Sequence, residues 1–255
     1  MNEIITEHLP TLLAALDTEP SCWWLRYRSS QETDHLRLRI RTNRHHYATC
    51  TNRVGEWAQR MRQAGIVGQL VIDTYYPEIG RYGHGAAMNA AEDVFVADSH
   101  LVATALRDLT TTTAAAHPTA LAVANMVGIV TGLVGEHAEA MDWLAARPVP
   151  STPTTDRAVT GQAIRLATDM GALREVPGWA AAVDHAWQAR ADTLATYRKH
   201  LPTDADLDRV VESLLHMHHN RALGIDPDGE RTCRRLARQA ALAWQTRHQG
   251  GGEGR

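Results

Sequence analysis

The sequence predicts an α+β fold in which a small antiparallel sheet near the N-terminus packs against a larger helical body. Strand-like alternation of polar and apolar residues occurs before Pro77, whereas after Gly85 the apolar residues recur at helical spacing. The chain of 255 residues is long enough to bury a substantial core. We therefore expect a single domain over residues 1–248, followed by a Gly-rich, disordered tail over residues 249–255.

Composition excludes several classes of function. The formal net charge of −3 gives no global basic field, so we expect no direct binding of nucleic acid. Cys22, Cys50 and Cys233 lie far apart without metal-ligand spacing, which is typical of a protein in a reducing cytosol. The uncharged run between Leu109 and Gly135 has an apolar part too short to span a membrane. We expect a cytoplasmic protein without membrane segment or metal, and without cofactor, since no Gly-rich phosphate loop or dinucleotide fingerprint occurs.

The N-terminal third combines helices and strands. Apolar residues at helical spacing predict a helix over Asn2–Leu16. Strict alternation predicts a hairpin of two strands, Cys22–Arg28 and Asp34–Thr42. We then expect a helix over Tyr47–Ala64 and a third strand over Gln69–Tyr76, which is rich in β-branched and aromatic residues.

The rest of the chain is expected to be helical. One long helix runs from Met88 to Leu106, and residues 147–155, which hold three prolines, form a loop that is the only candidate linker. The other expected helices cover Ala120–Val134, Asp156–Met170, Trp179–His200, Asp204–Leu223 and Glu230–Arg247.

The second strand of the hairpin carries a row of basic side chains. His35, Arg37, Arg39 and Arg41 lie two residues apart and therefore share one face. Because like charges side by side destabilise a sheet, the row favours an anionic ligand above it, and the guanidinium fork suits a carboxylate or a phosphate. Arg26 of the first strand is expected on the same arginine-bearing face. The alternative is that the row is a solvated outer face.

A turn rich in glycine and proline follows the third expected strand. It contains Glu78 and Arg81 and leads into the long helix, and such junctions commonly carry functional side chains. Arg81 lies near a helix N-terminus, so its charge and the helix dipole could act on one anion. The alternative is that Arg81 forms a structural ion pair with Glu78 or Asp98.

The expected helix Asp204–Leu223 carries three histidines. On a helical wheel His218 falls on the apolar stripe, whereas His216 and His219 fall on or near the opposite face. A neutral imidazole at position 216 could transfer protons near pH 7, and His219 is expected to be a surface residue. The histidines point in different directions, which disfavours a metal site.

Together these motifs resemble the lantibiotic dehydratase C-terminal domain, also known as the thiopeptide-type bacteriocin biosynthesis domain. The matching motifs are Trp-Trp-Leu-Arg-Tyr, His-Leu-Arg-Leu-Arg, Tyr-x-Pro-Glu-x-x-Arg-Tyr-Gly and His-Met-His-His-Asn-Arg. The resemblance implies glutamate elimination: a Ser or Thr of a ribosomal precursor peptide, esterified by glutamate from glutamyl-tRNA, becomes dehydroalanine or dehydrobutyrine. The glutamylating domain of full-length members is absent from this sequence, so the resemblance implies a stand-alone subunit that works with a separate glutamylating subunit in thiopeptide biosynthesis.

β-Elimination needs a base for the α-hydrogen, positive charge near the developing enolate oxygen and a site for the departing carboxylate. The resemblance assigns the positive charge to Arg37, Arg39 and Arg81. It assigns proton transfer to His216, which either removes the α-hydrogen or protonates the leaving glutamate. The residues expected to bind or position the substrate are Arg26, His35 and Glu78.

Two other functions stay open. Thiopeptide pyridine synthases resemble this domain but join two dehydroalanines in a formal four-plus-two cycloaddition. They tend to lose the elimination residues, so the presence of Arg37, Arg39, Arg81 and His216 favours elimination. The other alternative is a non-catalytic subunit that docks the precursor peptide or the glutamylating partner. The sequence also leaves open whether the protein is a homodimer.

Overall fold

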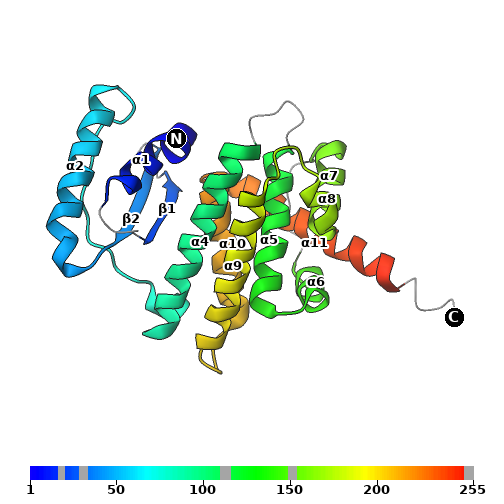
Figure 1. Cartoon of the computed structure of the whole chain (residues 1–255). Helices are drawn as coiled ribbons and strands as arrows, with labels where there is room; N and C mark the ends of the chain where they lie inside the picture. The colour runs from blue at the N-terminus through cyan, green and yellow to red at the C-terminus, as the bar shows by residue number, and fades with distance from the viewer. Residues whose placement is uncertain (17–20, 29–33, 110–115, 149–153, 250–255) are drawn as a thin grey trace.

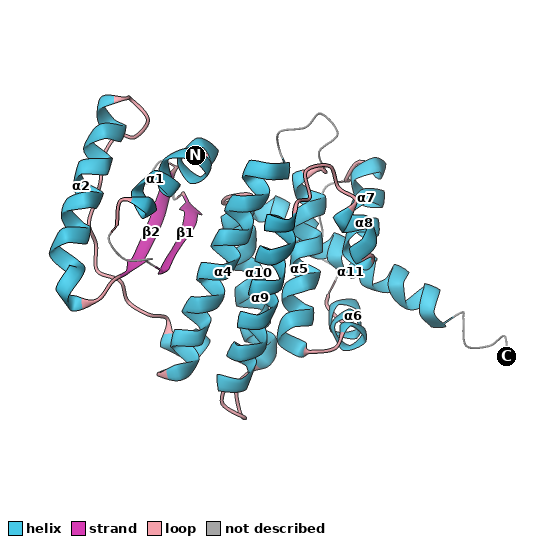
Figure 2. Cartoon of the chain, viewed as in Figure 1, coloured by secondary structure: helices cyan, strands magenta, loops and turns pink. Residues whose placement is uncertain are grey.

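The computed structural model describes residues 1–16, 21–28, 34–109, 116–148 and 154–249. Its N-terminal part holds a short hairpin between helices (Figures 1 and 2). The elements are the π-helical turn η1 (Ile4–His8), α1 (Leu9–Ala14), β1 (Ser21–Tyr27), β2 (His35–Arg41), the 3-10 turn η2 (Arg44–His46) and α2 (Tyr47–Gln63). The hairpin, the N-terminal helix and α2 therefore lie where the sequence predicts them.

The helical body is formed by the rest of the described chain (Figure 1). Its helices are α3 (Ile79–Tyr82), α4 (Ala86–Leu109), α5 (Pro118–Val134), α6 (His137–Ala145), α7 (Arg157–Thr168), α8 (Met170–Arg174), α9 (Ala181–His200), α10 (Leu207–Ala222) and α11 (Pro227–Gln249). The α+β class and the small antiparallel sheet against a helical body are confirmed. The tail expected over residues 249–255 lies outside the described residues, except for Gln249, which ends α11.

One expectation about secondary structure is wrong, and one helix was not predicted. The segment 69–76 forms no strand, and the only sheet within the described ranges pairs β1 with β2. Its β-branched residues fit a strand, but a strand also needs a hydrogen-bonding neighbour, and no described segment supplies one. The helix α6, His137–Ala145, was not expected, because its nine residues are too few for a clear periodic pattern.

The register of the hairpin decides which side chains share a face. Trp23 pairs with Arg39, and Arg26 pairs with Leu36. Because directly paired residues project to the same side, Trp23 and Tyr27 of β1 lie on the arginine face, and Trp24 and Arg26 lie on the opposite face. The expectation that Arg26 belongs to the arginine face is therefore wrong. Alternation within each strand fixes two faces but not how the strands are offset across the turn.

The face opposite the arginines packs against the N-terminal helix and α2. Leu36, Leu38 and Ile40 contact this cluster from β2. Its fully buried members are Ile5, Leu9, Leu12, Trp24, Trp57, Ala58, Met61 and Val102. Burial of these apolar side chains, at about 25 cal/mol per Å², holds the two-stranded sheet, since an isolated hairpin is only marginally stable.

Hydrogen bonds join the hairpin to the helical body along the free edge of β1. The backbone N–H of Trp24 donates to Ser99 Oγ of α4 at 3.2 Å. Arg221 Nε of α10 donates to the Trp24 carbonyl at 3.1 Å, and Arg26 Nε donates to the Arg221 carbonyl at 2.9 Å. These contacts fix the arginine-bearing hairpin relative to α4 and α10.

The uncharged helix α5 is a core helix of the body. Ala120, Val123, Met126, Val130 and Leu133 are each fully buried in the main apolar cluster. Among the described residues no single helix is long and apolar enough to cross a membrane. Helices α5 and α6, which are bent by 116° at the break between them, are together long and apolar enough for a membrane span, by length and composition alone.

Candidate functional site

The arginine face of the hairpin is lined by aromatic rings. The guanidinium carbon of Arg37 lies 3.4 Å from the centroid of the Tyr27 ring, and that of Arg39 lies 5.1 Å from the Tyr75 ring. Arg37 Nε also donates to His35 Nε2 at 3.3 Å. Cation–π contacts of this kind hold a guanidinium in place without neutralising its charge.

Arg41 has a different environment from its two neighbours in the row. Its two terminal nitrogens donate to Glu92 Oε2 at 2.9 Å and to Asp93 Oδ1 at 2.8 Å on α4. Arg41 therefore ties the hairpin to the helical body, and its charge is already neutralised. The row is thus neither a solvated outer face nor a set of equivalent cations.

Arg39 carries an unsatisfied hydrogen-bond donor. Its Nη1 atom is buried, and it has no hydrogen-bond partner among the described residues. Burial lowers the pKa of Arg39, the nearby Tyr75 and Glu78 raise it, and the charges of Arg37 and Arg221 lower it further. A buried N–H donor without an acceptor costs free energy, so this position favours binding of an anion.

The turn that follows residues 69–76 holds Glu78 and Arg81. Glu78 lies near the rings of Tyr75 and Tyr82, and Arg81 lies near the ring of Tyr82. Arg81 Nη1 lies 2.9 Å from Glu78 Oε2, and both side chains are partly exposed. Burial raises the pKa of Tyr82 to about 12, with Glu78 adding to the rise and Arg81 and Arg221 opposing it. The structure thus brings Arg39, Glu78 and Arg81 together around Tyr75 and Tyr82, although these residues come from separate parts of the sequence.

The alternative that Arg81 forms a structural ion pair is confirmed, with Glu78 as the partner. Asp98 is not the partner, because it lies in a buried ionic cluster of its own. Its Oδ1 accepts from Arg190 Nη1 at 2.9 Å and lies 3.0 Å from His218 Nδ1, and its Oδ2 accepts from Arg221 Nη1. Burial alone would raise the pKa of Asp98, but these three groups hold it well below its ordinary value. Arg221 Nη2 is buried without a partner in the described structure, so this cluster also carries an unsatisfied guanidinium donor.

Arg26 lies on the face opposite the arginine row, and its Nη2 atom, like Arg39 Nη1, is buried without a hydrogen-bond partner among the described residues. Besides its bond to the Arg221 carbonyl, its Nη1 donates to Asn2 Oδ1 at 2.8 Å, and burial lowers its pKa. These bonds join β1 to α10 and to the N-terminus, and the expected role of Arg26 in positioning a substrate stays a prediction.

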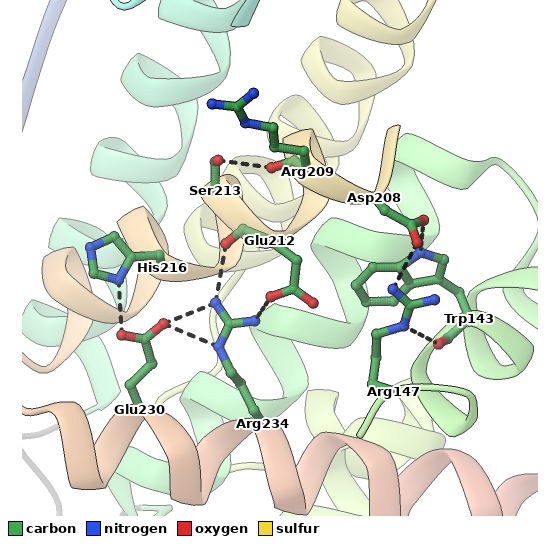
Figure 3. Close-up of polar contacts among 9 residues, drawn as sticks. All are labelled: Trp143, Arg147, Asp208, Arg209, Glu212, Ser213, His216, Glu230 and Arg234. Carbon is green, nitrogen blue, oxygen red and sulfur yellow. Dashed lines mark hydrogen bonds and ion pairs between the residues drawn. The ribbon is translucent and has the colours of Figure 1, made fainter. Parts of the chain in front are cut away.

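His216 projects from α10 toward the last helix (Figure 3). Its Nδ1 lies 2.8 Å from Glu230 Oε2 of α11, and its Nε2 lies 3.0 Å from Asn220 Nδ2. The His216 side chain is 47% exposed, as expected for a residue off the apolar stripe, whereas that of Glu230 is 15% exposed. An exposed imidazole oriented by a buried carboxylate is the arrangement that proton-transferring histidines use.

Glu230 is itself held by Arg234, as Figure 3 shows. Arg234 donates to Glu230 Oε1 from Nε at 3.1 Å and from Nη2 at 2.9 Å, and it also bonds Glu212. Burial raises the pKa of Glu230, but the bonds from His216 and Arg234 lower it to about 2. Sequence reasoning missed this residue, since fourteen positions and a turn between helices separate it from His216 and only the packing of α11 on α10 joins them.

The two other histidines of α10 are buried. His218 is 1% exposed and lies in the Asp98 cluster, as its place on the apolar stripe predicts. His219 is 0% exposed, and burial lowers its pKa, so the expectation of a surface residue is wrong. In the described ranges no three His, Cys, Asp or Glu side chains are grouped as they would be around a metal ion.

Helix α10 connects the two parts of the candidate site. It contacts α3, which holds Arg81, and β1, which pairs with the strand that holds Arg39. His216 and Arg221 lie five residues apart on this helix. Arg221 donates to the backbone carbonyl of Trp24, and the residue before Trp24, Trp23, is paired with Arg39. One helix thus carries the imidazole and also contacts the elements that hold the arginines.

Comparisons with known proteins agree on one family. The family model described as "Lantibiotic biosynthesis dehydratase C-term" matches residues 1–241. The subtilin biosynthesis protein SpaB of Bacillus subtilis is 33% identical over 85 residues, which are 33% of this chain and 8% of SpaB. The crystal structure of the tRNA dependent lantibiotic dehydratase MibB from Microbispora sp. 107891 superposes with a TM-score of 0.82 at 21% identity, over 97% of this chain and 27% of MibB. The chain therefore spans about a quarter of that dehydratase and shares its fold there.

Proposed function

The chain belongs to the family of lantibiotic biosynthesis dehydratase C-terminal domains, and from this premise we propose that it eliminates glutamate from glutamylated Ser or Thr residues of a ribosomal precursor peptide. The products are dehydroalanine and dehydrobutyrine. The observation that carries the proposal is the buried Arg39 guanidinium, which lies among Tyr75, Glu78 and Arg221 with one donor unsatisfied.

The reaction requires stabilisation of two negative charges. Removal of the α-hydrogen places charge on the carbonyl oxygen of the modified residue, and cleavage of the Cβ–O bond releases the glutamate carboxylate. In this proposal Arg37, Arg39 and Arg81 stabilise these charges, since a guanidinium binds a carboxylate with two parallel bonds. Glu78 holds Arg81 in place until a substrate carboxylate competes for it.

His216 transfers the proton. The amide nitrogen of Asn220 can only donate, so the neutral His216 ring accepts at Nε2 and carries its proton on Nδ1, bonded to Glu230. Nε2 gives up its bond from Asn220 when it takes up a proton, and the Glu230 carboxylate stabilises the imidazolium that forms. The same ring can remove the α-hydrogen or protonate the departing glutamate, and both roles use this orientation.

The proposed substrate arrives from another active site. A separate subunit that uses glutamyl-tRNA esterifies the precursor peptide, and this chain then acts on the ester, as the split arrangement of thiopeptide pathways implies. The match to MibB, described as a tRNA dependent lantibiotic dehydratase, covers 27% of the MibB chain.

Mass spectrometry of a precursor peptide tests the proposal. The peptide is incubated with a glutamylating subunit and glutamyl-tRNA, with and without this protein. We expect glutamyl adducts to accumulate without the protein and dehydrated residues to replace them when it is added. Adducts that persist in its presence would contradict elimination. A fused pair of dehydroalanines would instead indicate a pyridine synthase, and unchanged pathway output with His216→Ala would indicate a binding subunit.

A further inference from the structure

The loop between α2 and α3 is the largest exposed apolar segment of the described chain. Residues 68–81 are all exposed, and they include Val71 at 69%, Ile72 at 64% and Tyr76 at 79%. The sequence from Leu70 to Tyr76 is rich in β-branched and aromatic residues, which favour strands over exposed loops. Apolar side chains so gathered usually mark a surface that binds another molecule.

The backbone of this loop is free to pair. From residue 69 to residue 76 no backbone N–H or carbonyl bonds the backbone of another described segment, and no strand is formed. The Thr74 N–H is satisfied locally by Asp73 Oδ1 at 2.7 Å. Extended peptides pair with unpaired backbone groups at the exposed edge of a sheet, and this β-prone segment offers the same unpaired groups without yet forming a strand.

The loop leads directly into the candidate site. Its anchor is Tyr75, whose ring lies 5.6 Å from the Trp23 ring and 5.1 Å from the Arg39 guanidinium carbon. Glu78 and Arg81 follow within six residues (Figure 2 draws the loop as it reaches α3). A strand paired with residues 69–74 would therefore run toward the arginine cluster.

We propose that this loop binds the precursor peptide as an added β-strand and delivers its esterified side chain to Arg39 and Arg81. The proposal rests on the proposed function, which makes the occupant an unfolded peptide. Backbone pairing is independent of the peptide's side chains, and a shift by two residues keeps the same side chains on the same face. One surface can thus present successive Ser and Thr residues to one site.

N-methylated peptides test the pairing with the unaltered protein. A fluorescent dodecapeptide of Ala and Thr with one glutamyl-serine is made in versions that each carry one N-methyl group, and dissociation constants are measured by anisotropy. Since a strand directs alternate N–H groups to one edge, we expect methylation at every second position to weaken binding about ten-fold and the positions between to change little. A flat profile would overturn the proposal.

Proline variants locate the protein side of the pairing. Val71 and Ile72 are adjacent, so their N–H groups face opposite edges of an extended segment. We expect one of Val71→Pro and Ile72→Pro to weaken binding about ten-fold and the other to serve as its matched control. Equal affinity of both variants and the unaltered protein would contradict docking here, as would concentration-dependent dimerisation through this loop that leaves peptide binding unchanged.

Turnover of the same peptides separates this proposal from the proposed function. Elimination without an alternating N-methyl profile would contradict the docking surface and leave the activity standing. An alternating profile without elimination would support the docking surface and contradict the activity.

Discussion

His216 Nδ1 and Glu230 Oε2 lie 2.8 Å apart across the packed helices α10 and α11. Glu230 is mostly buried and held by Arg234, whereas the imidazole is half exposed. The carboxylate thus fixes the ring from one side, and Asn220 Nδ2 lies 3.0 Å from its other nitrogen, Nε2. If His216 moves the proton in elimination, Glu230 positions it.

Replacing Glu230 by Gln tests this positioning. The amide cannot stabilise an imidazolium as a carboxylate does, so we expect Glu230→Gln to lower the elimination rate by about 10–100-fold with little change in KM. Glu212→Gln is the matched control, because Glu212 bonds Arg234 but not His216. The elimination rates are measured as dehydrated peptide formed over time. Equal rates in Glu230→Gln and Glu212→Gln would contradict a role for Glu230 in the mechanism.

The depressed pKa of Glu230 predicts a pH-dependent contribution to stability. Its folded pKa of about 2 lies below the ordinary value of 4.5, so its ionised form stabilises the fold above pH 4.5, and this contribution is lost as the pH falls toward 2. At pH 7 we expect the free energy of unfolding of the unaltered protein to be about 2 kcal/mol higher than that of Glu230→Gln. This difference should decrease below pH 4.5. Urea titrations at several pH values measure the difference in free energy of unfolding. A difference that increases in acid would contradict the lowered pKa of Glu230.

Arg39 is expected to act through its guanidinium fork and not through charge alone. Arg39→Lys keeps a cation but loses bidentate binding, so we predict a fall in the rate of elimination of about 100-fold. Arg41→Lys is the control, since Arg41 is paired with Glu92 and Asp93. Steady-state kinetics on a glutamylated peptide separates them, and similar rates in both variants would argue against an anion at Arg39.

Asp98 is predicted to stabilise the fold, because three basic groups surround it in a buried cluster. Asp98→Asn leaves those charges uncompensated, and we expect it to lower the free energy of unfolding by about 3–5 kcal/mol. Asp93→Asn, at a half-exposed ion pair with Arg41, should cost at most about 1 kcal/mol. Denaturant titration at pH 7 compares them, and a small effect at Asp98 would mean that the cluster is not important for stability.

Much of the fold is readable from local patterns. Alternation from His35 to Arg41 predicts β2, and helical spacing predicts α2, α4, α5, α9 and α10 to within a few residues. These elements carry strong periodic signals because each buries one face. The segment 69–76 has a comparable signal, but whether it pairs depends on neighbours that its own sequence does not describe.

The site is only partly readable for the same reason. The position of His216 off the apolar stripe predicts its exposure, and the arginine row predicts a charged face. Two positions were not predicted. The offset between the strands places Arg26 on the face opposite the arginine row, and packing around α10 buries His219. Glu230 joins the site only through the packing of two helices, which no motif records.

The most direct measurement follows one defined substrate with the purified chain. A synthetic peptide with a single glutamyl-serine ester is incubated with the protein, and the products are separated by mass spectrometry. The account predicts dehydroalanine and free glutamate with the unaltered protein, and intact ester with His216→Ala and Arg39→Ala. Intact ester with the unaltered protein, or hydrolysis to serine in place of dehydroalanine, would contradict it.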